Sequence, residues 1–319
     1  MSQQGIIELV DLTKRYGDHT VVDNLTLSIP KSEVFGLLGP NGAGKSTTIL
    51  MMIGLTDPTS GSVTVCGINS TRNPIEVKRK VGYLPEDVGF YEDYTGLENL
   101  QYTAQLNGFS DKKSKQRALE VLDRVGLSSQ ADKKVGKYSR GMRQRLGLAD
   151  VLIKNPEVII LDEPTLGIDP KGVQELLSLI VALSKEEGLT VLLSSHHLHQ
   201  VQEICDRVGL FVKGRLIAEG NIESLSQSLF ANEPVIIEAG ISHSEHFVRD
   251  NLYQGLYGIN GVLSVNEKNG TLRLGCARDA APDISRTIVE SGASLLFMQK
   301  KEYGLDDIYN HYFKESGAS

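Results

Sequence analysis

The residues with the clearest chemistry form a glycine-rich loop, GPNGAGKS, at residues 39–46. It matches the pattern G-x-x-x-x-G-K-[ST], with the apolar run VFGLL before it and an apolar helical stretch after it, as a phosphate-binding loop requires. The glycines let backbone N–H groups turn toward one phosphate, Lys45 offers a positive charge, and the Ser46 hydroxyl suits Mg²⁺. The start of the following helix adds its dipole. The loop therefore predicts a site for a nucleoside triphosphate and Mg²⁺.

Two acids, Asp162 and Glu163, follow the apolar run VIIL at residues 158–161. An acid at the end of a buried strand beside the loop's own strand can hold Mg²⁺ through water, so Asp162 is predicted to serve the metal. Glu163 is one step further on and is predicted to polarise an attacking water. Taken alone, the pair would equally suit the cap of a turn, and the phosphate loop upstream favours catalysis.

A second anion-binding feature stands at residues 137–150, KYSRGMRQRLGLAD. Ser139 suits a helix N-cap and Gly141 an exposed backbone, and helix starts of this kind bind anions. An ordinary capped surface helix is the simpler alternative. The question is why one chain would carry two phosphate sites.

Length and composition set the frame. The 319 residues suggest two domains, and a content of 40% hydrophobic and 23% charged residues suits a globular core. A formal net charge of -7 disfavours a nucleic-acid partner. Cys66, Cys205 and Cys276 lie far apart, as free thiols of a reducing compartment do. No signal peptide and no run of about 18 apolar residues is visible, so any membrane role is expected through a partner.

Strand-like and helix-like segments alternate over residues 6–220, which predicts an α/β fold with a mostly parallel sheet. The strand candidates are 6–10, 21–29, 34–38, 62–66, 81–84, 158–164 and 190–195, with helices at 47–55, 172–187 and 198–206 and a closing hairpin at 209–220. A helical insert is expected at about 87–154. We place the domain boundary at 222/223.

Residues 223–319 change in texture. After a short helix, strands at 234–239, 261–266, 271–275 and 293–299 enclose helices at 243–254 and 282–291, and a last helix lies at 304–314. The order β-α-β-β-α-β predicts a ferredoxin-like α+β unit, with a hairpin at Asn269-Gly270. We interpret it as an accessory domain for dimerisation or partner docking. Sensing of a small ligand is the alternative.

With the phosphate loop, the 138–142 stretch and LDEP in this order, residues 6–220 resemble the ATP-binding subunit of an ABC transporter. YSRGM stands where that family has its LSGGQ signature. The resemblance implies a P-loop NTPase cassette with a β-subdomain and a helical subdomain, ATP and Mg²⁺ as cofactors, and two cassettes paired head to tail. Each signature then closes over the other chain's nucleotide, which explains the second anion site. The signature residues acting in trans are Ser139, Arg140, Gly141 and Met142.

Other roles carry over from the resemblance residue by residue. Tyr16 matches the aromatic that stacks on adenine, Asp169 lies in the loop that crosses the dimer interface, and His196 matches the switch histidine that acts with the catalytic Glu163. The metal set is Ser46, Asp162 and Glu86. The nucleotide set is Tyr16, Gly39, Pro40, Asn41, Gly42, Ala43, Gly44, Lys45, Ser46 and Thr47.

Three positions depart from the family pattern. Glu86, in VGYLPE, replaces a glutamine, Arg140 replaces a glycine and Met142 replaces a glutamine. A carboxylate can meet Mg²⁺ but cannot donate as an amide does. YSxGM and YLPE resemble the ABC-2 type exporter branch, with multidrug or sodium-efflux-like ATPases that carry a C-terminal extension.

The predicted function is therefore that of an ATPase that drives export through a separate integral membrane permease. The chain is expected to be cytoplasmic and to lie on the inner face of the cell membrane through its contact with that permease. Aromatics at residues 87–100 are expected to meet the permease, or else form a plain surface loop. The alternatives are an ATP-binding regulatory or scaffold subunit with little turnover, and an ABC ATPase without a transport role.

Histidines and lysines outside these motifs have simpler explanations. A metal site is disfavoured for His196, His197 and His199, because the chain passes from a strand into a helix there and a metal needs its ligands on one side at a shared point. His243 and His246 suit a solvated helix face better than a metal site. The lysines at 112, 113 and 115 suit a solvated helix start, with contact to acidic lipid as the alternative.

Overall fold

The computed structural model describes residues 5–242 and 249–315. The chain folds into two compact units, one built from the residues up to Leu225 together with the segment from Tyr309, the other from Ser226–Ile308. The boundary predicted at 222/223 falls three residues before the end of the first of these segments. Each unit has its own buried apolar cluster.

The centre of the larger unit is a six-stranded sheet of order β10-β9-β3-β8-β7-β6. The five strands from β9 to β6 run parallel, and β10 pairs antiparallel to β9 through a turn at Lys213-Gly214, both with positive φ. Every residue of β3, β7 and β8 is buried, as expected for strands covered on both faces. The strands are β3 Val34–Leu38, β6 Val81–Leu84, β7 Val158–Asp162, β8 Thr190–Ser195, β9 Arg207–Val212 and β10 Arg215–Gly220.

A second, antiparallel sheet of order β2-β1-β4-β5 joins the same core. Its strands are β1 Ile7–Tyr16, β2 His19–Ile29, β4 Ser60–Val65 and β5 Ile68–Asn69. Helix α1 (Lys45–Met52) begins two residues before the predicted start, because the loop passes directly into helical backbone after Gly44. The sequence prediction missed β5 and the short helix α2 (Pro74–Lys80), which lacks a long apolar repeat.

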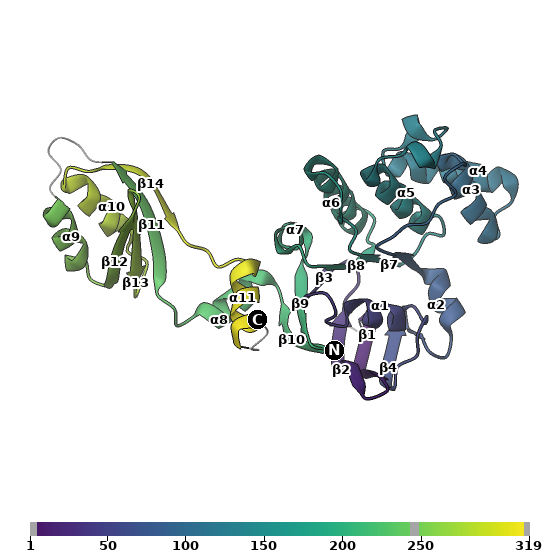
Figure 1. Ribbon diagram of the computed structural model, residues 1–319, viewed down its shortest axis with the longest axis horizontal. Helices are drawn as coiled ribbons and strands as arrows, with labels where there is room; N and C mark the ends of the chain where they lie inside the picture. Colours follow the sequence, from purple (N-terminus) through teal and green to yellow (C-terminus); the bar gives the residue numbers. More distant parts are fainter. Residues whose placement is uncertain (1–4, 243–248, 316–319) are drawn as a thin grey trace. The chain divides into compact units, whose positions relative to one another are not determined.

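Three helices fill the segment between β6 and β7, where the helical insert was expected: α3 (Gly96–Leu106), α4 (Asp111–Arg124) and α5 (Arg140–Leu152). They lie together, apart from the antiparallel sheet (Figure 1). A reciprocal capping box between Thr95 and Glu98 starts α3. Arg117 of α4 donates to the carbonyl oxygens of Leu152 and Ile153, so α4 closes the C-terminal end of α5.

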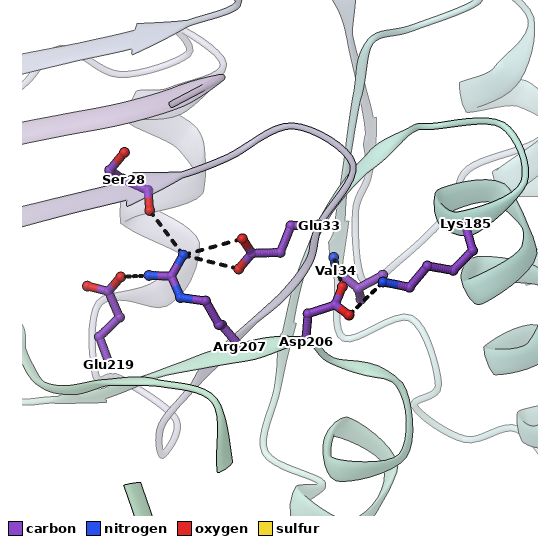
Figure 2. Close-up of polar contacts among 7 residues, drawn as sticks. All are labelled: Ser28, Glu33, Val34, Lys185, Asp206, Arg207 and Glu219. Atoms are coloured by element: carbon purple, nitrogen blue, oxygen red, sulfur yellow. Dashed lines mark hydrogen bonds and ion pairs between the residues drawn. The ribbon is translucent and has the colours of Figure 1, made fainter. Parts of the chain in front are cut away.

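Charged residues fix the entry of the central strands (Figure 2). Arg207 donates to both carboxylate oxygens of Glu33 at 3.2 and 3.3 Å, to the carbonyl of Ser28, and to Glu219. Beside it, Asp206 accepts from the backbone N–H of Val34 and from Lys185, the last residue of α6 (Pro170–Lys185). Burial raises the pKa of Glu33, and the guanidinium of Arg207 opposes that shift. The sequence analysis did not find this network.

The smaller unit holds a four-stranded antiparallel sheet of order β12-β13-β11-β14. With helices after β11 and β13, this is the predicted ferredoxin-like topology. Its elements are β11 Val235–Ser242, α9 Arg249–Gly258, β12 Val262–Lys268, β13 Thr271–Cys276, α10 Ala281–Glu290 and β14 Ser294–Lys300, with α8 Ile222–Phe230 before and α11 Leu305–Glu315 after. His243 and His246 lie outside the described residues. Of the helices described, none combines the length and apolar content needed to cross a membrane.

Candidate nucleotide site

The glycine-rich loop connects the end of β3 to α1, and two of its glycines, Gly39 and Gly44, leave no space for a side chain. A Cβ on Gly39 would lie 2.2 Å from the carbonyl oxygen of Phe211, and one on Gly44 would lie 2.5 Å from that of Val21. Gly44 also has φ 107°, which side-chain-bearing residues rarely adopt. The loop is therefore held against backbone from two other strands.

Lys45 is nine-tenths buried at the first residue of α1. Its ammonium donates to the carbonyls of Gly39 (2.6 Å) and Pro40 (3.2 Å) and lies 3.9 Å from Oε1 of Glu163. Burial lowers the pKa of Lys45, and the carboxylates of Glu163 and Asp162 oppose that shift. An ammonium has three N–H donors, so the two carbonyl contacts fix its direction and leave one donor for an anion.

Asp162 and Glu163 meet the loop from the end of β7. Asp162 accepts a hydrogen bond from the Ser194 hydroxyl, and the backbone N–H of Glu163 donates to the Ser194 carbonyl at 3.1 Å. One residue of β8 therefore positions both acids. Ser194 was missed in the sequence, although its place at the end of the run TVLLS beside LDE was a usable signal.

Glu163 has unusual geometry for a glutamate. Its φ is 49°, in the left-handed region, and only 7% of the residue is exposed. Among the described residues, neither carboxylate oxygen accepts a well-formed hydrogen bond, although Nδ1 of His196 lies 3.0 Å from Oε1. A buried carboxylate in this state has capacity for a further donor such as a water.

His196 follows β8 and precedes α7 (Leu198–Ile204). Its ring is partly exposed and lies 4.1 Å from that of His197, centre to centre, with the two planes tilted by 38°. The backbone N–H of His197 donates to Ser195 Oγ. Thr165 donates to Gln200 of α7 at 2.6 Å and ties the segment after Glu163 to this helix. The sequence analysis missed this contact. Within the described parts of the chain, no group of three or more His, Cys, Asp or Glu residues is placed to hold a metal.

The signature turn lies beside the predicted interface loop of the same chain. Ser139 accepts from the N–H of Met142 at 3.2 Å and caps α5, as predicted. The Arg140 guanidinium covers Gly167: a Cβ there would be 2.9 Å from its Nε. Asp169 caps α6 by accepting from Gly172. Among the described residues, no hydrogen bond or ion pair joins 139–142 to 39–47, and the action of the signature in trans stays a prediction.

Tyr16 and Glu86 lie further out. Tyr16 ends β1 with 52% of its surface exposed, and the ammonium of Lys14 lies 4.8 Å from the centre of its ring. Glu86 is exposed after β6 and lines a hollow of about 260 Å³ with Arg140 and Gln144. The described contacts do not join Glu86 to Ser46 or Asp162. Its part in the metal set stays a prediction.

The strand that ends in the two acids, β7, was expected directly beside β3, but β8 lies between the two strands in the sheet. A glycine-rich loop between a buried parallel strand and a helix, with two acids at the end of another strand of the same parallel sheet, defines a P-loop nucleoside triphosphatase. The family model described as "ABC transporter" matches residues 22–166. The bacitracin transport ATP-binding protein BcrA of Enterococcus faecalis is 36% identical over 324 residues, which cover 100% of both chains. The daunorubicin/doxorubicin resistance ATP-binding protein DrrA of Streptomyces peucetius is 38% identical over 71% of this chain and 68% of its own.

Solved structures agree. The protein named cbiO1 from Clostridium perfringens, part of the ABC transporter complex cbiONQ, is 28% identical with a TM-score of 0.65 over 72% of this chain and 92% of its own. A dimeric cassette bound to ADP and phosphate is 27% identical with a TM-score of 0.61 over 67% and 98%. The chain belongs to the ATP-binding subunits of ABC transporters. It is an ATPase, and the subunits of this family pair in dimers and work with membrane permeases.

Proposed function

We propose that two copies of this chain sandwich two MgATP head to tail and drive a separate permease that exports a compound of the bacitracin type. One observation carries the choice of compound: the match to the bacitracin transport subunit runs the full length of both chains and includes the C-terminal unit. The relatives named for linearmycin and daunorubicin match about 70% of this chain. They support export more generally.

The phosphate loop supplies binding. Residues 39–47 present backbone N–H groups, the α1 dipole and the ammonium of Lys45, whose direction the loop carbonyls already fix. Tyr16 stacks on the base with its exposed ring. Ser46 and Asp162 would hold Mg²⁺ through their hydroxyl and carboxylate oxygens, which suit this ion. Glu86 would join this set on movement of the loop after β6. The ion supplies neutralisation of phosphate charge.

Glu163 acts on the attacking water. Its carboxylate is buried, lacks a well-formed hydrogen bond and faces both Lys45 and His196, so it can accept a proton from a water beside the phosphate. His196 contacts this carboxylate through Nδ1 and stabilises the γ-phosphate of the bound ATP. The turn at 139–142 covers the partner chain's nucleotide with its capped helix start.

Contact with the permease falls to the aromatics after β6. Tyr91, Tyr94 and Tyr102 are 55%, 49% and 41% exposed. The centre of the Tyr91 ring lies 5.4 Å from that of Tyr94 and 5.5 Å from that of Tyr102. An exposed aromatic cluster next to the loop that bears Glu86 suits a protein interface. Replacing all three with Ser should abolish co-purification of the permease and leave the ATPase of the isolated subunit intact.

Complementation between two inactive chains tests the shared sites. Lys45→Ala and Ser139→Arg homodimers should both be inactive. Their mixed dimer keeps one complete site, so an equal mixture should recover about a quarter of the parental rate for random pairing. A mixture that stays inactive, or one that reaches the parental rate, contradicts composite sites.

Export is tested in cells that express the chain with its own permease and that are challenged with bacitracin. Survival that requires Glu163 supports the proposal. ATPase activity without protection would remove the compound from the proposal and leave the ATPase in place.

Glu86 and the altered signature favour one competing function, a scaffold that binds ATP with little turnover. The altered signature residues are Arg140 and Met142. A turnover measurement with the permease present in lipid separates the two functions.

A further inference from the structure

The hollow beside the signature turn is formed by the loop after β6 and the first turns of α5. The loop rests on α5 at Gly147, where a Cβ would lie 2.5 Å from Leu84 and 3.3 Å from Val88. One turn before this contact, Gln144 lines the hollow, and one further turn before that lies Arg140. The loop thus approaches the signature end of α5 with a gap of about 260 Å³ between them.

Both sides of this gap carry charge. Glu86 and Asp87 line it from the loop, and Arg140 and Arg143 from the helix. Arg143 is already paired with Glu92 at 2.8 Å. Among the described residues, no ion pair within 4.0 Å uses Glu86 or Arg140. The exposed carboxylate of Glu86 and the exposed guanidinium of Arg140 therefore line one hollow without a partner at contact distance, and the exposed carboxylate of Asp87 is likewise outside the described ion pairs.

Gln144 adds an independent observation. It is only 3% exposed, lines the hollow, and its Oε1 has no hydrogen-bond partner among the described residues. A buried acceptor without a donor is unfavourable. A guanidinium four residues earlier on the same helix face can supply that donor and still reach across the gap, since it has five N–H groups.

Both charges come from residues that depart from the family pattern. Glu86 stands where the family pattern has an uncharged glutamine, and Arg140 stands where it has a glycine without a side chain. Each change alone would add one charge without an opposite partner to this hollow. Together they supply opposite charges to one hollow.

We propose that Glu86 and Arg140 form an intrachain charge pair across this hollow, with Gln144 accepting from the same guanidinium. Arg140 also covers Gly167, so the pair fixes three segments to one another: the loop after β6, the signature turn and the interface loop. Arg140 and Glu86 act here as positioning residues. The pair rests on the proposed function only for its effect on ATP hydrolysis, where it holds Glu86 away from the metal set until the loop moves.

Hydrogen exchange of the nucleotide-free full chain tests the pair directly. Glu86→Gln and Arg140→Gly should each speed exchange of the backbone amides of residues 86–90 about two- to fivefold, the range of a partly exposed pair. The double variant should exchange no faster than either single variant. The reversed pair, Glu86→Arg with Arg140→Glu, should recover about half of the lost protection.

Asp87→Asn is the matched control, because this carboxylate lines the same hollow. It should change exchange little and show no coupling to Arg140. Additive effects of the two single variants, a reversed pair without recovery, or equal coupling through Asp87 would each overturn the proposal.

A second readout is the Mg²⁺ concentration that gives half-maximal ATPase. Arg140→Gly should lower it about two- to fivefold when Glu86 is present and leave it unchanged in the Glu86→Gln background. An equal shift in the Mg²⁺ concentration with Glu86 and with Gln at this position would refute the idea that Arg140 holds Glu86 away from the metal set. A parental chain without ATPase activity would refute the proposed function, and the exchange result would still decide the pair.

Discussion

Replacing Glu163 with glutamine is the sharpest test of the site, because the structure limits what the change can disturb. Glutamine has nearly the same volume, so the packing of a residue that is 7% exposed is kept. What is lost is one negative charge, 3.9 Å from the ammonium of Lys45 and 3.0 Å from Nδ1 of His196. The amide can no longer accept a proton from water.

The expected rate loss follows from the role of a general base. Such groups contribute roughly a hundredfold to ten-thousandfold, which is about 2.7 to 5.4 kcal/mol on the barrier. Binding should change in the other direction. Because the charge removed lies beside the phosphate loop, repulsion of the triphosphate falls and ATP should bind a few-fold more tightly. The variant should therefore accumulate as an ATP-bound dimer.

Phosphate release under single-turnover conditions gives the rate, and size-exclusion chromatography with and without MgATP gives the dimer. Glu157→Gln is a suitable control, since it removes an exposed carboxylate paired with Lys80, outside the site. A Glu163→Gln chain that hydrolyses ATP at the rate of the Glu157→Gln control would refute Glu163 as the base. A slow variant that stays monomeric with ATP would refute the trapped dimer.

Three further changes test other parts of the structure. Arg207→Met should lower the free energy of unfolding by about 2 to 4 kcal/mol in urea titrations, because it leaves the buried Glu33 without a partner. This loss of stability should shrink at low pH, where Glu33 protonates. A loss smaller than that caused by Lys185→Met would contradict the role of Arg207 as the partner of Glu33. Burial raises the pKa of Cys66 from 9.0 to about 11, so the neutral thiol is favoured in the fold. The stability that the neutral Cys66 thiol contributes is fully present below pH 9 and is lost as pH rises toward 11. In the Cys66→Ala variant, the free energy of unfolding should therefore fall less steeply between pH 9 and 11. Tyr16→Ala should weaken ATP binding about fivefold or more by equilibrium titration while Tyr16→Phe binds normally, and equal affinities would exclude stacking.

Much of the larger unit could be predicted because local pattern and tertiary position agree there. VFGLL, VIILD and TVLLSS are short apolar runs, and each became a fully buried strand of the parallel sheet. The signature helix was located from one serine, whose hydroxyl caps α5. The ferredoxin-like order of the smaller unit followed from its strand spacing and from the Asn269-Gly270 turn.

The missed features depend on contacts between residues far apart in the chain. Arg207 meets Ser28 and Glu33 across more than 170 positions, and no local pattern marks an arginine as the partner of a particular glutamate. Helix α2 is only seven residues long with one buried side chain, too short for an apolar repeat. Glu86 was assigned to the metal set because it stands where the family pattern has a glutamine, and this assignment stays a prediction.

Glu163 combines two features that oppose folding, and their coincidence supports a catalytic role more strongly than the motif does. A left-handed φ at a residue other than glycine costs on the order of 1 to 3 kcal/mol, and a buried carboxylate without a full set of donors adds to that. Ser194 holds the backbone of Glu163 and the side chain of Asp162, so the two adjacent carboxylates must leave β7 in different directions. Relaxing the strain would turn Glu163 away from His196 and Lys45. The end of β8 holds this conformation through the Ser194 carbonyl, and the conformation keeps the carboxylate beside Lys45 and His196, as the proposed general base requires.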